Sequence, residues 1–208
     1  MSSVPIVTYL LIAVTAGVSL MAFNNGKLMQ RLLLWPPAIE RRRQYDRLLT
    51  HGFVHADQMH LFFNMFTLFF FGRALEPIFT AWIGPIGFLG FYLSAIVVAI
   101  LPSYLRHRHD PQYSSLGASG AVSALVFSSI LFDPWSWFFV LFVPMPAIGF
   151  AILYVAYSVW MDKRGGGGIN HSAHLAGAAY GILFTVLLRP AIVPHFLQQL
   201  TNPTFPSF

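Results

Sequence analysis

Residues 117–132 read GASGAVSALVFSSILF, an apolar stretch that opens with small residues and a serine. A helix from Ala118 to Phe132 would have about 15 residues and span about 22 Å, at 1.5 Å per residue. The hydrocarbon core of a bilayer is about 30 Å thick. We therefore expect this helix to begin below the membrane surface, with Ser119 several ångströms inside the membrane.

The composition indicates an integral membrane protein. Of the 208 residues, 56% are hydrophobic and only 9% are charged, whereas a soluble domain has about 25% charged residues. The absence of Cys excludes disulfides, thiolate metal sites and a Cys nucleophile. The basic triplet 41–43 could suggest a nucleic-acid partner. Basic residues beside a membrane more often contact lipid headgroups, so we expect the lipid bilayer and no nucleic acid.

Six apolar segments predict an all-α fold, a polytopic bundle of six transmembrane helices. A span takes about 20 helical residues, and the second and fourth segments are shorter than that. Irregular backbone at membrane depth is tolerated only beside protein or a water-filled cavity. The short segments thus indicate a submerged site. The segments cover residues 4–23, 59–72, 78–105, 118–132, 135–160 and 171–188.

The remaining stretches predict the organisation around this bundle. Residues 24–58 are too long and too rich in aromatic residues and proline for a plain linker, so we expect a folded first loop lying at the membrane interface. The four glycines 165–168 suit a mobile lid or a flexible linker. We expect one domain over 1–208, with a helical core at about 4–189 and a disordered or surface-lying tail at 190–208.

Charge is divided unequally between the two sides of such a bundle. The first, third and fifth loops carry ten of the twelve Lys and Arg residues, and the side with the termini carries only Arg73 and Arg189. The positive-inside rule would place those three loops in the cytoplasm. The ten are Lys27, Arg31, Arg41, Arg42, Arg43, Arg47, Arg106, Arg108, Lys163 and Arg164.

Ser119 and His174 are the candidate catalytic pair. A serine at a helix start has free backbone N–H groups and a favourable helix dipole beside it, although a G-x-S-G string is also typical of simple helix packing. His174, Gly177 and Gly181 share one face of the last helix, where the glycines allow a neighbouring helix to approach closely. A buried imidazole needs a partner, and Ser119 is a chemically sensible one. The alternative is a hydrogen-bonded structural histidine.

His60 and Asn64 stand at i and i+4 at the start of the second helix. Both side chains donate hydrogen bonds and could stabilise an oxyanion, or they could form a polar clamp between helices. His51, His55 and His60 together suggest a metal site. Zinc is disfavoured because no H-E-x-x-H helix or Cys accompanies them. We expect no metal, and expect His51 and His55 to hold the first loop to the second helix by hydrogen bonds.

Three motifs together resemble those of the rhomboid family of intramembrane serine proteases. Residues 50–64, THGFVHADQMHLFFN, are similar to the family's second-helix signature, residues 117–120 to its G-x-S-G, and residues 173–181 to its last-helix motif. Their order and separation agree over essentially the whole chain. The resemblance implies the six-helix bacterial form, without a cofactor.

The resemblance also implies roles for individual residues. Ser119 would attack the scissile carbonyl and form an acyl-enzyme, with His174 as general base and no carboxylate third member. The Ser119 N–H, His60 and Asn64 would hold the oxyanion. Supporting residues would be His51, His55, Gly117, Gly120, Gly177, Gly181 and the loop arginine Arg47.

Some residues depart from the family pattern. Tyr45 and Asp46 replace the aromatic residue that usually precedes the loop arginine. Ser123 stands where many members place an aromatic ring against the catalytic histidine, so the orientation of His174 must come from elsewhere. His171 has no clear family role.

One further pair agrees with the family pattern. Gly72 and Glu76 match a G-x-x-x-E that ends the second helix.

The predicted function is cleavage of transmembrane segments in single-span membrane proteins, near small, helix-destabilising residues. By resemblance, substrate would arrive laterally past the second and fifth helices, with Phe63 and Trp160 as gate residues, and the protein would be a monomer in the bacterial inner membrane. The family's usual topology puts the site outside the cytoplasm, against the charge count. The alternatives are a polytopic transporter or channel, and an inactive rhomboid-like chaperone, although such relatives lose the serine or the histidine.

Overall fold

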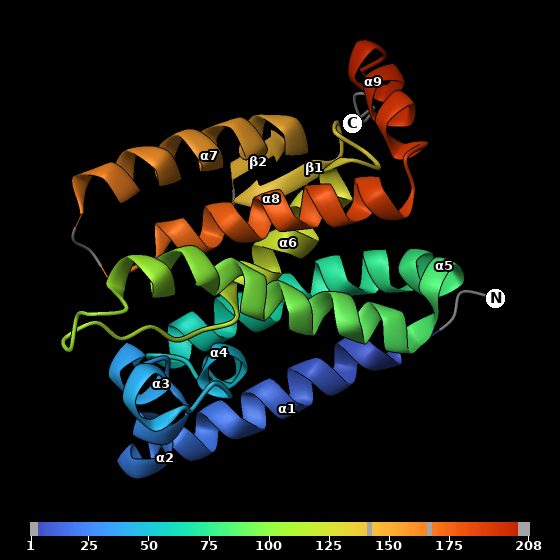
Figure 1. Ribbon diagram of the computed structural model, residues 1–208. Helices are drawn as coiled ribbons and strands as arrows, with labels where there is room; N and C mark the ends of the chain where they lie inside the picture. The colour runs from blue at the N-terminus through green and yellow to red at the C-terminus, as the bar shows by residue number, and fades with distance from the viewer. Residues whose placement is uncertain (1–3, 141–142, 166–167, 204–208) are drawn as a thin grey trace.

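The computed structural model describes residues 4–140, 143–165 and 168–203, which form a helical bundle with one small hairpin (Figure 1). The two ends of the glycine run 165–168 are described, and its middle lies outside the described residues. The elements are α1 (Ile6–Phe23), α2 (Gly26–Leu32), α3 (Pro36–Arg42), α4 (Arg47–Thr50), a 3-10 turn η1 (His51–Phe53), α5 (Gln58–His107), α6 (Ser119–Ile130), β1 (Trp137–Val140), β2 (Val143–Pro146), α7 (Ala147–Arg164), α8 (His171–Leu188) and α9 (Ile192–Thr201).

Helix α5 is folded back on itself and supplies two of the bundle's helices. The fold occurs at Gly84, whose φ of 72° and ψ of 169° are non-helical and suit glycine, and Pro85 follows it. The two halves, 58–83 and 85–107, would each span more than about 30 Å at 1.5 Å per residue. Each half is therefore long enough to cross a bilayer core.

The predicted end of the second helix near Gly72 and Glu76 is wrong. The first half of α5 continues to residue 83, and the charged group inside it is satisfied by another helix. Glu76 is buried, and its two carboxylate oxygens accept hydrogen bonds from the backbone N–H groups of Val7 (2.9 Å) and Thr8 (2.7 Å). The Glu76 side chain thus sits at the N-terminus of α1, where the helix dipole favours an anion.

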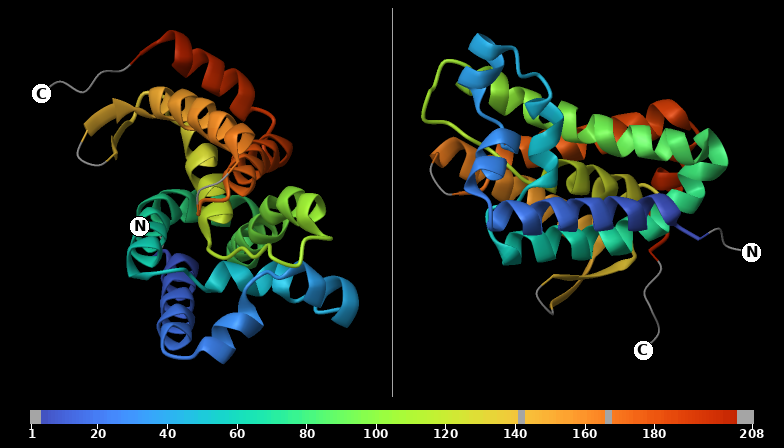
Figure 2. Two further views of the ribbon diagram at one scale, coloured as in Figure 1. Left: turned by 90° about the vertical axis from the view of Figure 1, so that its left-hand side faces the viewer. Right: turned by 90° about the horizontal axis from the view of Figure 1, so that it is seen from below.

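Helix α6 lies at the centre of the bundle. Ten of its twelve residues are buried, and it packs mainly against α8 and α5 (Figure 2, left). At 1.5 Å per residue it spans only about 18 Å, so it is shorter even than the sequence predicts. Its first residue, Ser119, therefore lies within the bundle.

The fifth predicted segment is wrong in its first part. Residues 137–140 and 143–146 form the antiparallel hairpin β1–β2, and α7 begins only at Ala147. Prolines at 134, 144 and 146 prevent a continuous helix, and the aromatic and β-branched sequence WFFV favours a strand. The helix then continues to Arg164, four residues beyond the predicted end at Trp160.

The tail also contains regular structure. Helix α9 occupies residues 192–201, where Trp135 Nε1 donates a hydrogen bond to the carbonyl of Gln199 at 3.0 Å. Most of its residues are exposed, which agrees with a surface-lying tail but not with a disordered one. Residues 204–208 lie outside the described residues.

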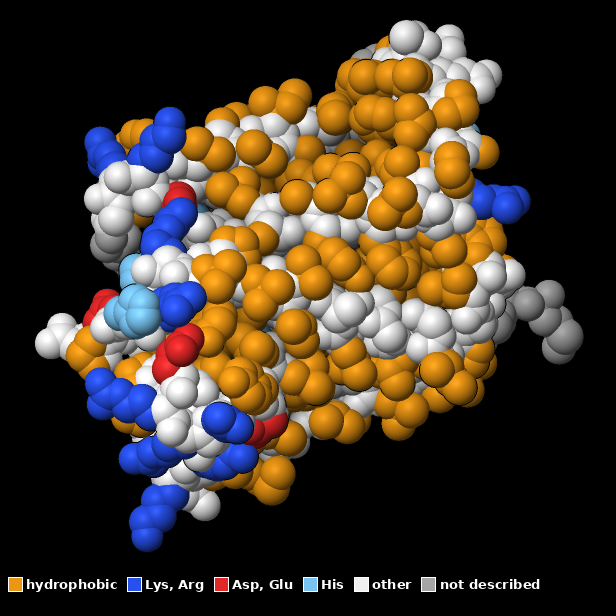
Figure 3. Space-filling model, viewed as in Figure 1, with side chains coloured by type: hydrophobic (Ala, Val, Ile, Leu, Met, Phe, Trp, Pro, Cys, Tyr) orange, Lys and Arg blue, Asp and Glu red, His pale blue; other side chains and the backbone are white. Residues whose placement is uncertain are grey.

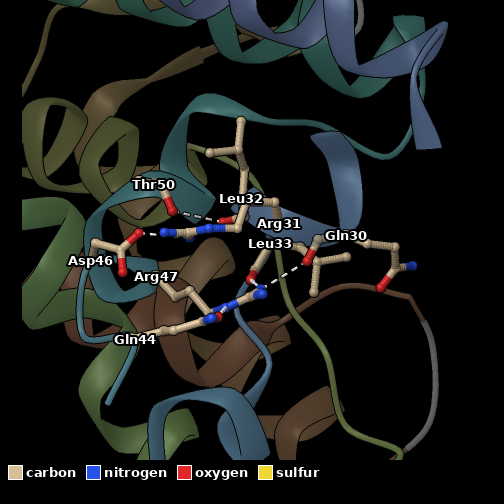
Figure 4. Close-up of polar contacts among 8 residues, drawn as sticks. All are labelled: Gln30, Arg31, Leu32, Leu33, Gln44, Asp46, Arg47 and Thr50. Atoms are coloured by element: carbon tan, nitrogen blue, oxygen red, sulfur yellow. Dashed lines mark hydrogen bonds and ion pairs between the residues drawn. The ribbon is translucent and has the colours of Figure 1, made fainter. Parts of the chain in front are cut away.

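The first loop is folded, as predicted, into α2, α3, α4 and η1. Arg47 is buried at its centre and binds carbonyl groups at the end of α2: Nη1 donates to Gln30 (2.8 Å) and to Leu33 (2.6 Å), and Nε donates to the Gln44 side chain at 2.7 Å (Figure 4). One guanidinium thus joins the end of α2 to the start of α4, the contact expected of a loop-supporting arginine.

The surface divides into an apolar body and one charged end. Hydrophobic side chains cover the middle of the face in Figure 3, and most of its Lys and Arg side chains gather at the end formed by the first loop and the C-terminus of α7. Among the described residues, α1, α5 and α8 are long and apolar enough to cross a membrane, and α6 is a shorter apolar helix. The predicted all-α membrane bundle is confirmed.

Candidate active site

Ser119 and His174 meet across the contact between α6 and α8. Ser119 Oγ lies 2.8 Å from His174 Nε2, a hydrogen-bond distance. Ser119 is the first residue of α6, and no side chain caps that helix. The first N–H groups of the helix therefore lack helical partners and are directed toward the region around the serine. Neither residue comes from a loop, so the pair is held by two helices.

The closeness of α6 and α8 depends on two glycines. A Cβ added at Gly177 would overlap the carbonyl of Gly120, and one added at Gly181 would overlap the carbonyl of Ala124. The backbones of the two helices are thus in direct contact along the face that carries His174. Ser128, further along α6, continues this contact by donating a hydrogen bond to the carbonyl of Gly181 at 3.0 Å.

Gly117 forms the turn before α6 and packs against His60. Its φ of 112° is one that L side chains rarely adopt, and a Cβ there would come within 2.7 Å of His60 Cε1. Glycine is therefore required at this position on two counts. His60 itself lies in the first turn of α5, where the Asp57 side chain caps the helix by accepting a hydrogen bond from the His60 N–H at 2.8 Å.

Two residues of the first loop hold the backbone before Ser119. The Gly117 N–H donates to the carbonyl of His51 (2.9 Å), and the Ala118 N–H donates to His55 Nε2 (3.3 Å). Burial lowers the pKa of His55 to about 3, so its ring is neutral. Because Nε2 accepts, Nδ1 carries the proton and donates to Ser19 Oγ at 2.9 Å. His55 thus links α1, the first loop and α6.

A cavity of about 1110 Å³ opens beside Ser119 and His174, and the side chains of His60, Asn64 and Phe63 also line it. Asn64 is buried and uses one amide N–H to donate to the carbonyl of His60 at 2.9 Å. Its second N–H is available to a group in the cavity. The four residues predicted for catalysis and the oxyanion are therefore brought to one cavity.

The predicted gate residues are not equivalent. Phe63 lines the cavity and is half exposed, whereas Trp160 on α7 is not among the cavity residues and carries the Arg164 guanidinium over its ring at 3.9 Å. No group of three or more His, Cys, Asp or Glu side chains suited to a metal occurs in the described part of the chain.

Two features of the site were not predicted from the sequence. Asn170 caps α8 by accepting a hydrogen bond from the Ala173 N–H (3.0 Å), and Ser103 donates to the same oxygen (2.7 Å). An Asn directly before an apolar helix is a known capping signal and could have been found. The second feature is the Tyr154 ring of α7, which stacks on His174 with 6.0 Å between ring centroids. No local pattern indicates a contact between two different helices.

Comparison with known proteins gives consistent matches. Residues 42–191 match the family model described as the Rhomboid domain. The chain is 28% identical over 197 residues to "RHOMBOID-like protein 12, mitochondrial" of Arabidopsis thaliana, covering 86% of this chain and 57% of that protein. It is 30% identical over 157 residues to "Rhomboid protease GlpG" of Enterobacter sp., covering 72% and 51%.

A third relative is "Presenilin-associated rhomboid-like protein, mitochondrial" of Homo sapiens, which is 30% identical over 144 residues and covers 66% of this chain and 36% of that protein. The chain thus spans about half the length of the relatives it matches, or less. Several relatives are named as mitochondrial, and another, from Arabidopsis thaliana, as chloroplastic, so the matches do not support the predicted bacterial inner membrane.

Proposed function

The chain belongs to the rhomboid family, and from that premise we propose that it is an intramembrane serine endopeptidase with Ser119 as nucleophile and His174 as general base. The observation that supports this most directly is the 2.8 Å separation between Ser119 Oγ and His174 Nε2. A nucleophile and base at hydrogen-bond distance, beside a cavity, form the arrangement that activates a serine. A histidine that served only to pack α8 would not require this cavity.

The reaction follows from this pair. His174 Nε2 takes the proton from Ser119 Oγ as the oxygen attacks the scissile carbonyl carbon, and then gives that proton to the leaving amine. The acyl-enzyme that remains is hydrolysed by a water molecule, which His174 activates in the same way. No carboxylate is recorded in contact with His174 within the described residues, so the pair acts as a dyad.

The oxyanion formed in each step is held by N–H donors beside Ser119. The candidates are the Ser119 backbone N–H at the start of α6, the second amide N–H of Asn64, and the His60 ring, which packs on Gly117. These donors come from two helices, and the first loop fixes them relative to Ser119 through His55.

The substrate class follows from where the cavity lies. Rhomboid proteases act on membrane proteins within the bilayer, and here the apolar surface of the bundle surrounds the helices that carry the dyad. We extend the proposal to single-span substrates with small, helix-destabilising residues at the cleavage point, which have to unwind to reach Ser119. On the same basis, we propose that they arrive between the first half of α5 and α7, past Phe63 and Trp160, to a monomeric enzyme.

The proposal is tested by covalent labelling. The purified protein in detergent is treated with a fluorophosphonate probe, which modifies activated serines, and wild type is compared with Ser119→Ala and His174→Ala. Labelling of wild type alone is the expected result. Labelling of Ser119→Ala at the wild-type level contradicts the nucleophile assignment.

Ser129→Ala is a matched control, because Ser129 lies on the same helix and its hydroxyl donates a hydrogen bond to the carbonyl of Val126 at 2.7 Å, away from His174. A single-span reporter protein in liposomes supplies the second measurement. Its cleavage by wild type and Ser129→Ala, but not by Ser119→Ala, distinguishes a protease from an inactive relative that merely binds membrane proteins.

A further inference from the structure

His174 has a second neighbour besides Ser119. The Tyr154 ring on α7 lies nearly parallel to the imidazole, with 15° between the planes and 6.0 Å between centroids. This geometry falls in the range of offset stacking between rings. The imidazole is thus in contact with Ser119 at one edge and with Tyr154 on one face, and the His171 ring meets it edge-on at 5.9 Å between centroids.

The Tyr154 ring is fixed at its other end by Ser123. The Ser123 hydroxyl donates its proton to the carbonyl of Ser119 at 2.8 Å, so at 2.7 Å it accepts from the Tyr154 hydroxyl. A chain of two hydrogen bonds therefore runs from Tyr154 to the backbone of Ser119. Tyr154 thus contacts His174 through its ring and is connected to the Ser119 carbonyl through the Ser123 hydroxyl.

Tyr154 lies on the inward face of α7, where Phe150, one turn earlier, packs against its ring with 5.4 Å between centroids. Ala147, Ala151 and Ser158 are buried, and with Tyr154 they follow at i, i+4, i+7 and i+11, which puts them on one helix face. The residues on either side, such as Leu153, are exposed. The Tyr154 ring is therefore held in place by Phe150 and by Phe127 of α6, whose ring lies 5.5 Å from it between centroids, as well as by the hydrogen bond to Ser123.

A second tyrosine of α7 provides an internal comparison. Tyr157 packs edge-on against His171, with 5.5 Å between centroids, and it is half exposed. α7 thus contributes two tyrosine–histidine pairs to its contact with α8. Only the pair of Tyr154 and His174 includes a residue whose nitrogen reaches Ser119.

We propose that Tyr154 is a positioning residue, which holds the His174 imidazole toward Ser119 and so makes the reactivity of the serine depend on where α7 lies. The inference rests on the proposed function. An imidazole without a carboxylate partner is free to rotate about its side-chain bonds, and a stacked ring restricts that rotation. When α7 moves away from α8, the ring leaves with it and the base loses its orientation.

This arrangement has a consequence for substrate binding. Met161 and Asp162, further along α7, line the same cavity as the dyad. A substrate that displaces α7 to reach the cavity also displaces Tyr154. Ser119 is then fully reactive only once α7 has returned against α8, with the substrate in place.

The test compares the rate at which the fluorophosphonate probe labels Ser119 in four variants, together with the melting temperature of each. Tyr154→Leu removes the ring, and we expect labelling to slow about three- to tenfold, the effect of losing one aromatic stacking contact. Tyr154→Phe keeps the ring and is expected within about twofold of wild type. Tyr157→Leu, the matched control, is expected to label at the wild-type rate even where it lowers stability.

The fourth variant asks whether a ring supplied from another helix restores the rate. Ser123→Tyr in the Tyr154→Leu background puts a tyrosine on α6, next to the space that the Tyr154 ring leaves, and we expect it to recover most of the lost labelling. A residue that only stabilised the fold would not be replaced in this way. If Tyr154→Leu does not fold, Tyr154→Met takes its place with the same expectation.

Several results would overturn the inference. Wild-type labelling of Tyr154→Leu, or equal slowing in Tyr157→Leu, would show that the ring does not position His174. These results leave the proposed function intact if wild type is labelled and Ser119→Ala is not. Absence of labelling in wild type would overturn both proposals together.

Discussion

Replacing His55 by alanine tests whether the first loop positions the start of α6. The His55 ring is fully buried and accepts from the Ala118 N–H, which is itself buried. Leaving that donor without a partner costs about 1–3 kcal/mol. The T-shaped contact with the His60 ring, at 4.9 Å between centroids, adds about 0.5–1.5 kcal/mol.

The sum is about 3 kcal/mol, since Ser19 keeps its other hydrogen bond, to the carbonyl of Phe53 at 3.0 Å. For a chain of this size, that corresponds to a fall in melting temperature of about 6–12 °C. Labelling of Ser119 by the probe is expected to slow as well, because the backbone before it is released.

The control is Ser19→Ala, which removes the partner of the His55 ring on α1 but leaves the acceptor for Ala118. We expect a smaller loss of melting temperature, measured in the same detergent, and near wild-type labelling below the transition. The reasoning would be refuted if His55→Ala labelled at the wild-type rate. An equal fall in melting temperature in both variants would show that the hydrogen bond from the Ala118 N–H does not contribute more to stability than the bond to Ser19.

Three further predictions concern stability. Gly181→Ala forces a Cβ against the α6 backbone and is expected to lower the unfolding free energy by about 1–3 kcal/mol. A Cβ at Gly17 meets nothing within 4 Å, so the control Gly17→Ala is expected to be neutral or mildly stabilising when both variants are compared by thermal melting. Glu76→Gln replaces one charge-assisted acceptor at the start of α1 and is expected to cost about 2 kcal/mol in the same assay, so an unchanged melting temperature would contradict the capping role. Burial lowers the pKa of His51 to about 4 and of His55 to about 3, from 6.5 when unfolded. Because the unfolded chain binds these protons more tightly, the free energy of unfolding is highest above pH 6.5. It falls by about 1.4 kcal/mol per histidine for each pH unit between 6.5 and the folded pKa. In His55→Gln, the fall in unfolding free energy measured between pH 7 and 4 should therefore be smaller than in wild type.

Much of this bundle could be predicted from apolar segments, and the errors have physical causes. The apolar segments leave a break between residues 72 and 78, but α5 continues through it, and another helix satisfies the charge of Glu76 there. The sequence predicts a helix through residues 137–146 because hydropathy does not distinguish a buried helix from a strand, although the prolines there argue for the strand. In both places the deciding fact is a partner or a backbone constraint that average hydropathy does not measure.

The candidate site divides in a similar way. Ser119, His174, His60 and Asn64 could be identified because each stands at or near a helix start, where polar groups in an apolar chain are conspicuous. Tyr154 could not, because an aromatic residue on an apolar helix has no distinguishing local pattern. Its significance depends on which rings it meets, and that is a property of the packing of α7 against α8.

The composition of α6 explains how such a site can exist at membrane depth. The helix carries serines at 119, 123, 128 and 129, which would be unfavourable on a face exposed to lipid. Ten of its twelve residues are instead buried by neighbouring helices, and each of these serines has a hydrogen-bond partner, for example the carbonyl of Gly181 for Ser128. The helix is also too short to span the bilayer core, and Ser119 at its N-terminus lines the cavity. The protein, not the lipid, therefore surrounds these polar groups, as the proposed reaction requires.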